Sequence, residues 1–346
     1  MPLSVVVGGQ FGSEGKGKIA QFIAQTRSAA AVVRVGGPNS GHSAVNELGK
    51  LITLRQLPAS SISTNAKIIL PAGSLIDVAL LLKEIELLGI SADRLRIDAN
   101  ASIVTEEHRD EERNEALTAT IGSTGSGTGA ALRERLSRVR SHILARDEPR
   151  LQPFLEESTS AVMRTLLNDN ERIVIEGTQG FGLSIWQTKD FPYATSRDTT
   201  AAAFVSEAGL APHDVDDVAM VLRSFPIRVG GNSGPLPNEI DWPTLADEAD
   251  LPSDYHELTS ATFRVRRVAR FDECVVRDAI ISNRPHRIFM NHMDYIDPRW
   301  TIAGPTDRSV RFLEDVERRI GQPIDYIGFG PSRLEPAARL DIKRSA

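Results

Sequence analysis

LSVVVGGQFGSEGKGK, residues 3–18, is a strand that runs into a glycine-rich turn and then into a helix. The apolar residues 3–7 suit a buried strand, and the residues from Ile19 onward continue at helical spacing. Glycines let backbone N–H groups converge on an anion, and the helix N-terminus behind them favours negative charge. Lys16 and Lys18 add point charges for phosphate oxygens. The segment therefore predicts a phosphate-binding loop, and a glycine-rich turn without a ligand is the alternative.

This loop departs from the common P-loop, which reads G-x-x-x-x-G-K-[ST]. Residues 12–18 have that spacing, but Ile19 occupies the place of the hydroxyl that would hold Mg²⁺. The mismatch argues against an ordinary P-loop kinase or GTPase. A P-loop NTPase with a regulatory or scaffold role is a second alternative.

The bulk composition excludes some classes of partner. The 346 residues carry a net charge of -6, with 41% hydrophobic and 25% charged residues. An acidic chain is a poor binder of nucleic acid or of a membrane surface. The single cysteine, Cys274, rules out a disulfide within the chain and suits a reducing cytoplasm, and its helical context predicts a small buried packing residue. We expect a cytoplasmic protein without a signal peptide or a membrane span.

Short apolar runs alternate with helical stretches along the chain, which predicts an α/β fold around a largely parallel sheet flanked by helices. The length allows one large domain or two smaller ones. Functional loops should then lie at the carboxyl ends of the strands. The predicted strands are Leu3–Val7, Ala31–Val35, Lys67–Leu70, Leu95–Ile97, Arg172–Glu176, Val218–Arg223, Arg287–Asn291 and Asp325–Gly328. The predicted helices are Lys18–Arg27, Val78–Leu88, Arg133–Ile143, Ser158–Leu167, Thr199–Ala208, Phe271–Ser282 and Val310–Ile320.

Several later segments carry candidate functional residues. His42 lies in the glycine-rich GGPNSGHS, residues 36–43, where it is placed to touch phosphate or to act as an acid. The segment GSTGSGTG, residues 122–129, is either a ligand loop or a flexible linker. Gln179 in EGTQG has an amide that can serve a ligand as both donor and acceptor. Arg264 and Arg266 have guanidinium forks that can bind carboxylate in bidentate fashion, and a solvated basic face is the alternative.

Residues 8–18 resemble G-x-Q-[WF]-G-x-E-G-K-G-K, the signature of the adenylosuccinate synthetases. These ligases join aspartate to C6 of a purine nucleotide with the help of a nucleoside triphosphate. The resemblance spans nearly the whole chain and implies a single domain, residues 1–346, with the P-loop-like α/β fold of that family. Further matching segments are residues 36–43, 122–129, 176–180, 191–196, 259–267, 289–294 and 328–333.

The resemblance implies a role for each matching residue. The catalytic residues would be Ser13, Lys16 and His42, and Ser13 and the Gly41 carbonyl would hold Mg²⁺. The purine monophosphate would contact Ser13, Glu14, Gly15, Lys16, Asn39, Ser40, Thr124, Arg138, Gln179, Thr195 and Arg264. The triphosphate would contact Gly12, Gly15, Lys16, Gly17, Lys18, Gly41, His42, Ser43, Arg266, Asn291, His292, Asp294, Gly328, Gly330 and Pro331. L-Aspartate would contact Ala261, Thr262, Phe263, Arg264 and Arg266.

Ser13 stands where the family normally has an aspartate that removes the purine N1 proton and binds Mg²⁺. This replacement resembles the viral 2-aminoadenylosuccinate synthetases (PurZ), which act on dGMP, and it implies diaminopurine deoxynucleotide synthesis in a host cytoplasm. Glu14, a water or the substrate phosphate could serve as the base instead. The alternative is a divergent adenylosuccinate synthetase that uses IMP and GTP.

The phosphate donor and the oligomeric state also follow from the resemblance. His292 replaces a lysine that packs on guanine, so ATP or dATP is expected rather than GTP, although Asp294 argues the other way. Phe263 replaces a glycine near the ribose, which would suit a deoxyribose. Arg138 matches an arginine that reaches the neighbouring subunit, which implies a homodimer, and a solvated helix charge is the alternative.

Overall fold

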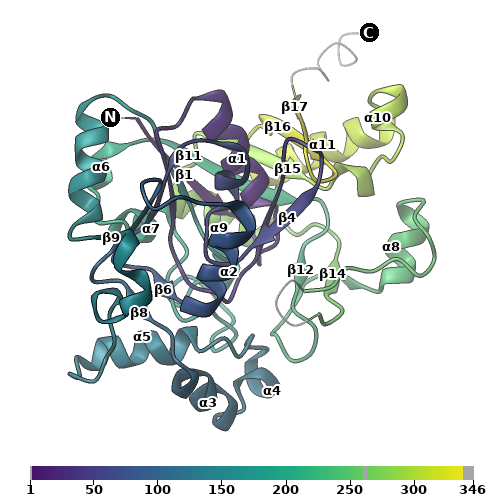
Figure 1. Cartoon of the computed structure of the whole chain (residues 1–346). Coiled ribbons are helices and arrows are strands. Elements are labelled where there is room, and N and C mark those ends of the chain that lie inside the picture. The colour runs from purple at the N-terminus through teal and green to yellow at the C-terminus, as the bar shows by residue number, and fades with distance from the viewer. Residues whose placement is uncertain (1, 260–262, 338–346) are drawn as a thin grey trace.

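The computed structural model describes residues 2–259 and 263–337, and it has a wide β-sheet with helices on both faces (Figure 1). Neighbouring strands of this sheet are parallel, apart from the pair β16–β17. Within the described ranges its strand order is β17 (Arg333–Pro336), β16 (Tyr326–Phe329), β15 (Arg287–Asn291), β11 (Val215–Arg223), β1 (Leu3–Gly8), β10 (Ile173–Glu176), β2 (Ala31–Arg34), β5 (Lys67–Leu70), β7 (Leu95–Asp98) and β9 (Leu155–Glu156). The predicted α/β fold around a largely parallel sheet is confirmed.

Among the residues that the structure describes, three small sheets accompany the large one. They are β12 (Ile227–Arg228), β14 (Arg267–Ala269) and β13 (Glu239–Ile240); β3 (His42–Val45) and β4 (Leu51–Leu54); and β6 (Leu75–Ile76) and β8 (Ser102–Ile103). The α-helices are α1 (Lys16–Thr26), α2 (Val78–Leu88), α3 (Glu106–Asn114), α4 (Leu117–Ile121), α5 (Thr128–Ser137), α6 (Thr159–Asn168), α7 (Ala201–Glu207), α8 (Trp242–Glu248), α9 (Cys274–Asn283), α10 (Trp300–Ala303) and α11 (Asp307–Ile320). Short 3₁₀ turns are η1 (Ala59–Ser63), η2 (Ala145–Asp147), η3 (Pro149–Phe154), η4 (Phe181–Leu183), η5 (Pro212–Asp214) and η6 (Met293–Tyr295).

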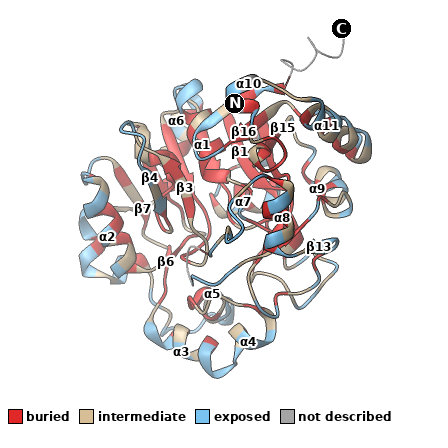
Figure 2. Ribbon diagram, turned by 90° about the vertical axis from the view of Figure 1, so that its right-hand side faces the viewer, coloured by how far each residue is buried: buried red, intermediate tan, exposed pale blue. Residues whose placement is uncertain are grey.

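Alternation along β1 divides the apolar side chains between two cores. Leu3, Val5 and Val7 belong to the core that α6, α7, α9 and α11 cover. Val6 points to the other face, where it packs with residues of α1 and α2. Both faces of the strand are therefore buried, which explains the unbroken apolar run in the sequence. Figure 2 shows the buried strands at the centre and exposed residues on the outer helices.

Several details differ from the sequence-based predictions. The helix expected at 133–143 is α5, which begins at Thr128 and ends because Arg138 takes the left-handed conformation, with φ +55°. The edge strands β9 and β17 were not predicted, because β9 has two residues and β17 is polar and contains a proline. The prediction that Cys274 is buried was wrong, because α9 begins at this residue and leaves its thiol exposed.

The parallel strands place the candidate residues at one edge of the sheet. The glycine-rich loop follows β1, the segment with Gln179 follows β10, and the segment with His292 follows β15. Since β10, β1, β11 and β15 are neighbours, these loops converge in space although they are far apart in the sequence. Among the described residues, no helix combines the length and the apolar character that crossing a lipid bilayer requires.

Candidate functional site

Glu14 gives the glycine-rich loop its shape. Its buried carboxylate accepts hydrogen bonds from the backbone N–H of Gly12 (2.8 Å) and of Gln10 (3.2 Å). The other oxygen lies 2.7 Å from Nζ of Lys16. The loop also needs left-handed φ values at Gly12 (+93°), Ser13 (+56°) and Gly15 (+90°). The side chain of Glu14 therefore closes the loop from within and does not line the cavity outside it.

A second loop fits tightly against the first. A Cβ on Gly180 would lie 2.4 Å from the Gly12 nitrogen and 2.5 Å from the carbonyl oxygen of Gln10. The N–H of Gly182 donates to that carbonyl at 2.7 Å. Only glycine fits at position 180, and this close contact brings Gln179 to the mouth of the first loop.

A cavity of about 540 Å³, the first cavity, opens above these loops. Most of the residues that the sequence predicted to bind ligands line this cavity. Those that line it are Gly12, Ser13, Gly15, Lys16, Gly17, Lys18, Asn39, Ser40, Gly41, His42, Ser43, Thr124, Gln179, Arg266, Asn291, His292, Asp294, Gly330 and Pro331.

An adjoining cavity of about 330 Å³, the second cavity, extends the first one. Thr195 lines it together with Thr124, and residues Asn39 and Gln179 border both cavities. Arg228 lies at its wall, where its guanidinium stacks 4.2 Å from the ring centroid of Phe11. The two joined cavities provide a phosphate loop at one end and two threonine hydroxyls at the other.

Some predicted residues lie outside both cavities. Arg138 is exposed at the end of α5, and Phe263 and Arg264 are exposed after the gap in the described residues. Gly328 lies behind the wall, where a Cβ would come within 1.9 Å of Asn291 Oδ1. Ala261 and Thr262 lie outside the described residues.

Lys18 connects the loop to the turn between β16 and β17. Its ammonium donates to the carbonyls of Phe329 (3.2 Å) and Gly330 (3.1 Å). Burial lowers its pKa to about 8, and the Asp294 carboxylate opposes that shift. Asp294 itself accepts a hydrogen bond from the N–H of Gly330 at 3.2 Å. The Gly330 N–H therefore engages one oxygen of Asp294, the carboxylate that the sequence assigned to the nucleobase.

His42 belongs to a buried cluster at the start of β3. Its Nδ1 lies 2.7 Å from Oε1 of Glu176, which also receives Arg34 Nη1 at 3.0 Å. The same Arg34 nitrogen contacts Nδ1 of His42 and lies 3.2 Å from its Nε2. Burial and the Arg34 guanidinium lower the pKa of His42 to about 3, although Glu176 opposes the shift. The ring is therefore neutral at pH 7, with Nδ1–H donating to Glu176.

Because the pKa of His42 is depressed, acid should destabilise the fold through this residue. Between about pH 6.5 and pH 3 the unfolded chain binds a proton at this ring that the folded chain does not bind, so stability falls as pH is lowered through that window. The limiting slope is about 1.4 kcal/mol per pH unit for one proton. Urea unfolding at pH 7, 6 and 5 should show a steeper loss for the natural chain than for His42→Asn. Equal losses would contradict this assignment.

Sequence reasoning missed a second buried cluster, which lies beneath Ser13. Arg223 is fully buried and donates to the carbonyl of Ser13 at 3.2 Å and to Glu257 at 2.5 Å. Tyr295 donates to the same carboxylate at 2.7 Å. Burial alone would raise the pKa of Glu257, but Arg223 and His292 hold it well below its usual range. In the sequence, this buried cluster was signalled by the position of Arg223 at the carboxyl end of a predicted strand.

The fold and the two joined cavities suit a protein that holds a phosphorylated ligand at the carboxyl ends of parallel strands. The family described as adenylosuccinate synthetase matches residues 5–148 and 144–303. The adenylosuccinate synthetase of Methanococcus aeolicus is 37% identical over 339 residues, which cover 96% of this chain and 97% of that protein. The one from Thermococcus onnurineus is 36% identical over 351 residues, with 99% of each chain covered.

Two solved structures are also similar. The PurZ succinoaminodeoxyadenylate synthetase of cyanophage S-2L, bound to dGMP and to dATP as an energy donor, superposes with a TM-score of 0.81 at 28% identity, over 99% of this chain and 97% of that one. The fully ligated adenylosuccinate synthetase of Plasmodium falciparum gives 0.84 at 21% identity, over 96% and 98%, which supports the fold alone.

The chain belongs to the adenylosuccinate synthetase family. It is therefore a carbon–nitrogen ligase that joins aspartate to a purine nucleotide, with Mg²⁺ and a nucleoside triphosphate.

Proposed function

We propose that this ligase joins L-aspartate to C6 of dGMP and gives 2-amino-2′-deoxyadenylosuccinate, with ATP or dATP as the phosphate donor. The observation that carries the proposal is Ser13, which lines the first cavity where the family normally has aspartate. The smaller side chain leaves space beside the purine C2, and its oxygen can accept a hydrogen bond from a 2-amino group. The likeness to the cyanophage protein bound to dGMP and dATP supports the same substrates.

The second candidate is an adenylosuccinate synthetase that uses IMP and GTP. It is favoured by the archaeal adenylosuccinate synthetases, which at 36–37% identity are more similar in sequence than the cyanophage protein. Asp294, a carboxylate that could read guanine, also favours it. Two features argue against GTP. The Gly330 N–H already engages one oxygen of that carboxylate, and His292 stands in place of the expected lysine.

Steady-state assays with dGMP, GMP and IMP, each with aspartate and ATP, test the substrate. We expect dGMP to have the highest kcat/KM. A site that satisfies the 2-amino group leaves a polar partner unpaired when IMP binds, which costs about 1–3 kcal/mol. Faster turnover of IMP would identify the second candidate. Hydrolysis of triphosphate without either aspartate or a purine monophosphate would instead indicate an NTPase.

The proposed reaction has two steps. The purine 6-oxygen, made nucleophilic by loss of the N1 proton, attacks the γ-phosphate, and the aspartate amine then displaces phosphate at C6. Lys16, Lys18 and the loop amides would stabilise charge on the transferring phosphoryl group. His42 would donate from Nε2 to the 6-oxygen, which requires the ring to gain a proton when the anionic substrates enter. Glu14 is held within its loop, so a water or the substrate phosphate is left as the N1 base.

Mg²⁺ fits the first cavity as an ion held chiefly by substrate phosphates. Gly41 offers a carbonyl and Ser13 a hydroxyl, and both residues line the cavity. Mg²⁺ takes oxygen ligands and keeps several from water and phosphate. Both protein donors are uncharged. The Glu14 carboxylate, which would be a charged ligand, is turned into the loop and away from the cavity. When bound, the ion would neutralise charge on the phosphoryl oxygens.

We also propose a homodimer in the cytoplasm. Arg138 is exposed beside Leu136 (71% exposed), Val139 (43%) and Ile143 (40%), and apolar groups this accessible suit a subunit interface. Sedimentation should show a dimer at concentrations where the enzyme is active, and Leu136→Asp should shift it toward monomer with loss of activity. An active monomer of the natural chain would contradict the proposal.

A further inference from the structure

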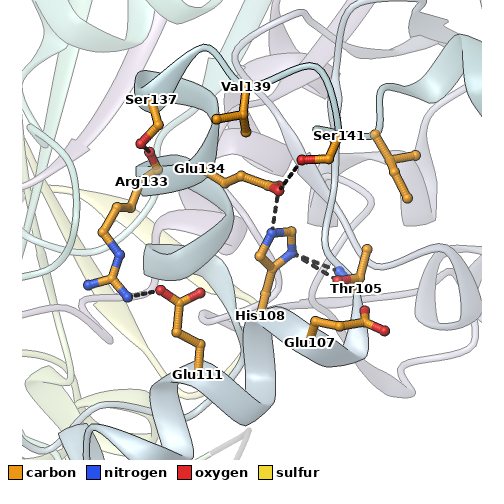
Figure 3. A pocket seen from close by; sticks show the side chains of 10 residues that line it. Thr105, Glu107, His108, Glu111, Arg133, Glu134, Ser137, Val139 and Ser141 are labelled. Atoms are coloured by element: carbon orange, nitrogen blue, oxygen red, sulfur yellow. Dashed lines mark hydrogen bonds and ion pairs between the residues drawn. The ribbon is translucent and has the colours of Figure 1, made fainter.

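A third cavity of about 540 Å³ shares none of its lining residues with the first two. Residues of α3, of α5 and of the segment after α5 line it (Figure 3). Glu134 Oε2 lies at its edge, 2.9 Å from Nε2 of His108 and 2.8 Å from Nδ1 of His142. Two imidazole nitrogens thus converge on one carboxylate oxygen from different parts of the chain.

This cluster has the donor set of a transition-metal site. The three ligand atoms all lie within 4.8 Å of one another. Both histidine side chains are 7% exposed and Glu134 is 29% exposed, so the site is sheltered; His108 and Glu134 line the cavity, and His142 lies behind them. Two imidazoles and one carboxylate, with a position left for water, form a common zinc environment. Glu107 and Glu111 also line the cavity, and Arg133, another lining residue, forms an ion pair with Glu111, so Glu107 is the one of the two that adds negative charge.

The hydrogen bonds around the rings show what metal binding would change. His142 has Ser102 Oγ at 3.0 Å from Nε2, a partner that can orient the ring while Nδ1 binds a metal. His108 accepts the backbone N–H of Thr105 at Nδ1 (3.0 Å), so its Nε2 carries the proton when no metal is present. A metal at Nε2 requires that proton to move to Nδ1. The hydrogen bond from the Thr105 N–H to Nδ1 must then break, and the ring turns its Nδ1–H toward the Thr105 hydroxyl, 3.3 Å away, which can accept it.

We propose that His108, Glu134 and His142 form a binding site for a divalent transition metal, with Zn²⁺ as the ion that this donor set suits best. The ion would tie α3 to α5 and to the segment after it. Glu112 on α3 accepts the N–H groups of Gly127 (2.9 Å) and Gly129 (2.8 Å). A metal at this place would therefore also steady the loop that carries Thr124, at the wall of the second cavity.

Titration of the chelator-treated full chain with Zn²⁺ or Co²⁺ alone tests the site. We expect one equivalent to bind per chain, a rise in Tm, and little competition from Mg²⁺. His142→Gln and Glu134→Gln should weaken binding by at least about 100-fold, and Ser102→Ala by about tenfold. The control is His213→Gln, which changes an exposed histidine outside the cluster and should bind as the natural chain does.

X-ray absorption of the Zn²⁺-loaded natural chain keeps the proposal testable if a ligand variant fails to fold. The expected spectrum shows two imidazole nitrogens and oxygen at about 2.0–2.2 Å. Absence of saturable binding, a spectrum without histidine, or equal affinity of His142→Gln and the natural chain would overturn the proposal. The cluster would then be a hydrogen-bonded tie between helices.

Discussion

Replacing His42 by asparagine is expected to lower kcat for ligation by about 10²–10⁴-fold while the fold remains intact. The ring lines the first cavity and is oriented from behind by Glu176 and Arg34. Asparagine can keep a hydrogen bond to Glu176, but it cannot take up a proton and become a cationic hydrogen-bond donor to the 6-oxygen. The loss should therefore appear in kcat rather than in KM.

Two further variants sharpen this test. His213→Asn changes an exposed histidine and should leave kcat unchanged. Glu176→Gln keeps an oxygen near Nδ1 but removes the negative charge that opposes the low pKa of His42. We expect it to lower kcat less than His42→Asn and to move the alkaline limb of the pH–rate profile, where the protonated ring is lost, to lower pH. If His42→Asn raises KM for the triphosphate and keeps kcat within about tenfold, the ring serves binding alone.

Ser13→Asp is expected to lower kcat/KM for dGMP by about 10–200-fold, the range that one crowded group in a fitted pocket produces. The added carboxylate would occupy the space that we assign to the 2-amino group. The change should stay local because Arg223 holds the carbonyl of residue 13 and because aspartate tolerates the left-handed φ of +56°. Relative activity toward IMP should rise.

Ser13→Asn and Ser13→Ala separate size from charge. Asparagine has the size of aspartate without its charge, so crowding predicts that Ser13→Asn loses dGMP activity as well. Ser13→Ala keeps the space but removes the hydroxyl, and its kcat/KM for dGMP should fall by the worth of one hydrogen bond, about 1 kcal/mol. Unchanged preference for dGMP in Ser13→Asp would show that position 13 does not select the substrate.

The central sheet could be predicted because its strands are buried on both faces and therefore have unbroken apolar runs. β1 and β10 are examples, since every residue of each is buried. Such runs also locate the carboxyl ends where loops gather. By contrast β9 and β17 are short or polar, and their pairing depends on neighbours that no local pattern reveals.

The candidate site was predictable where glycines mark it, as in the loops that hold Lys16, His42 and Gln179. The buried charges behind these loops were not. Arg223 and Glu257 are 34 residues apart in the chain, and their pairing follows from tertiary packing alone. Glu14 was predicted to contact substrate, but its carboxylate faces the backbone of its own loop, an orientation that residue type does not determine.

This self-contained loop has a consequence for how tightly the enzyme can hold a phosphate. Glu14 orders the Gly12 and Gln10 amides in advance, so binding need not spend conformational entropy on assembling the loop. The same carboxylate keeps these two N–H groups from the ligand, so the anion must rely on the amides that begin α1. The loop is preorganised, but two of its N–H groups are unavailable to the ligand. We therefore expect modest affinity for inorganic phosphate and higher affinity for a whole nucleotide, which also contacts the rest of the cavity.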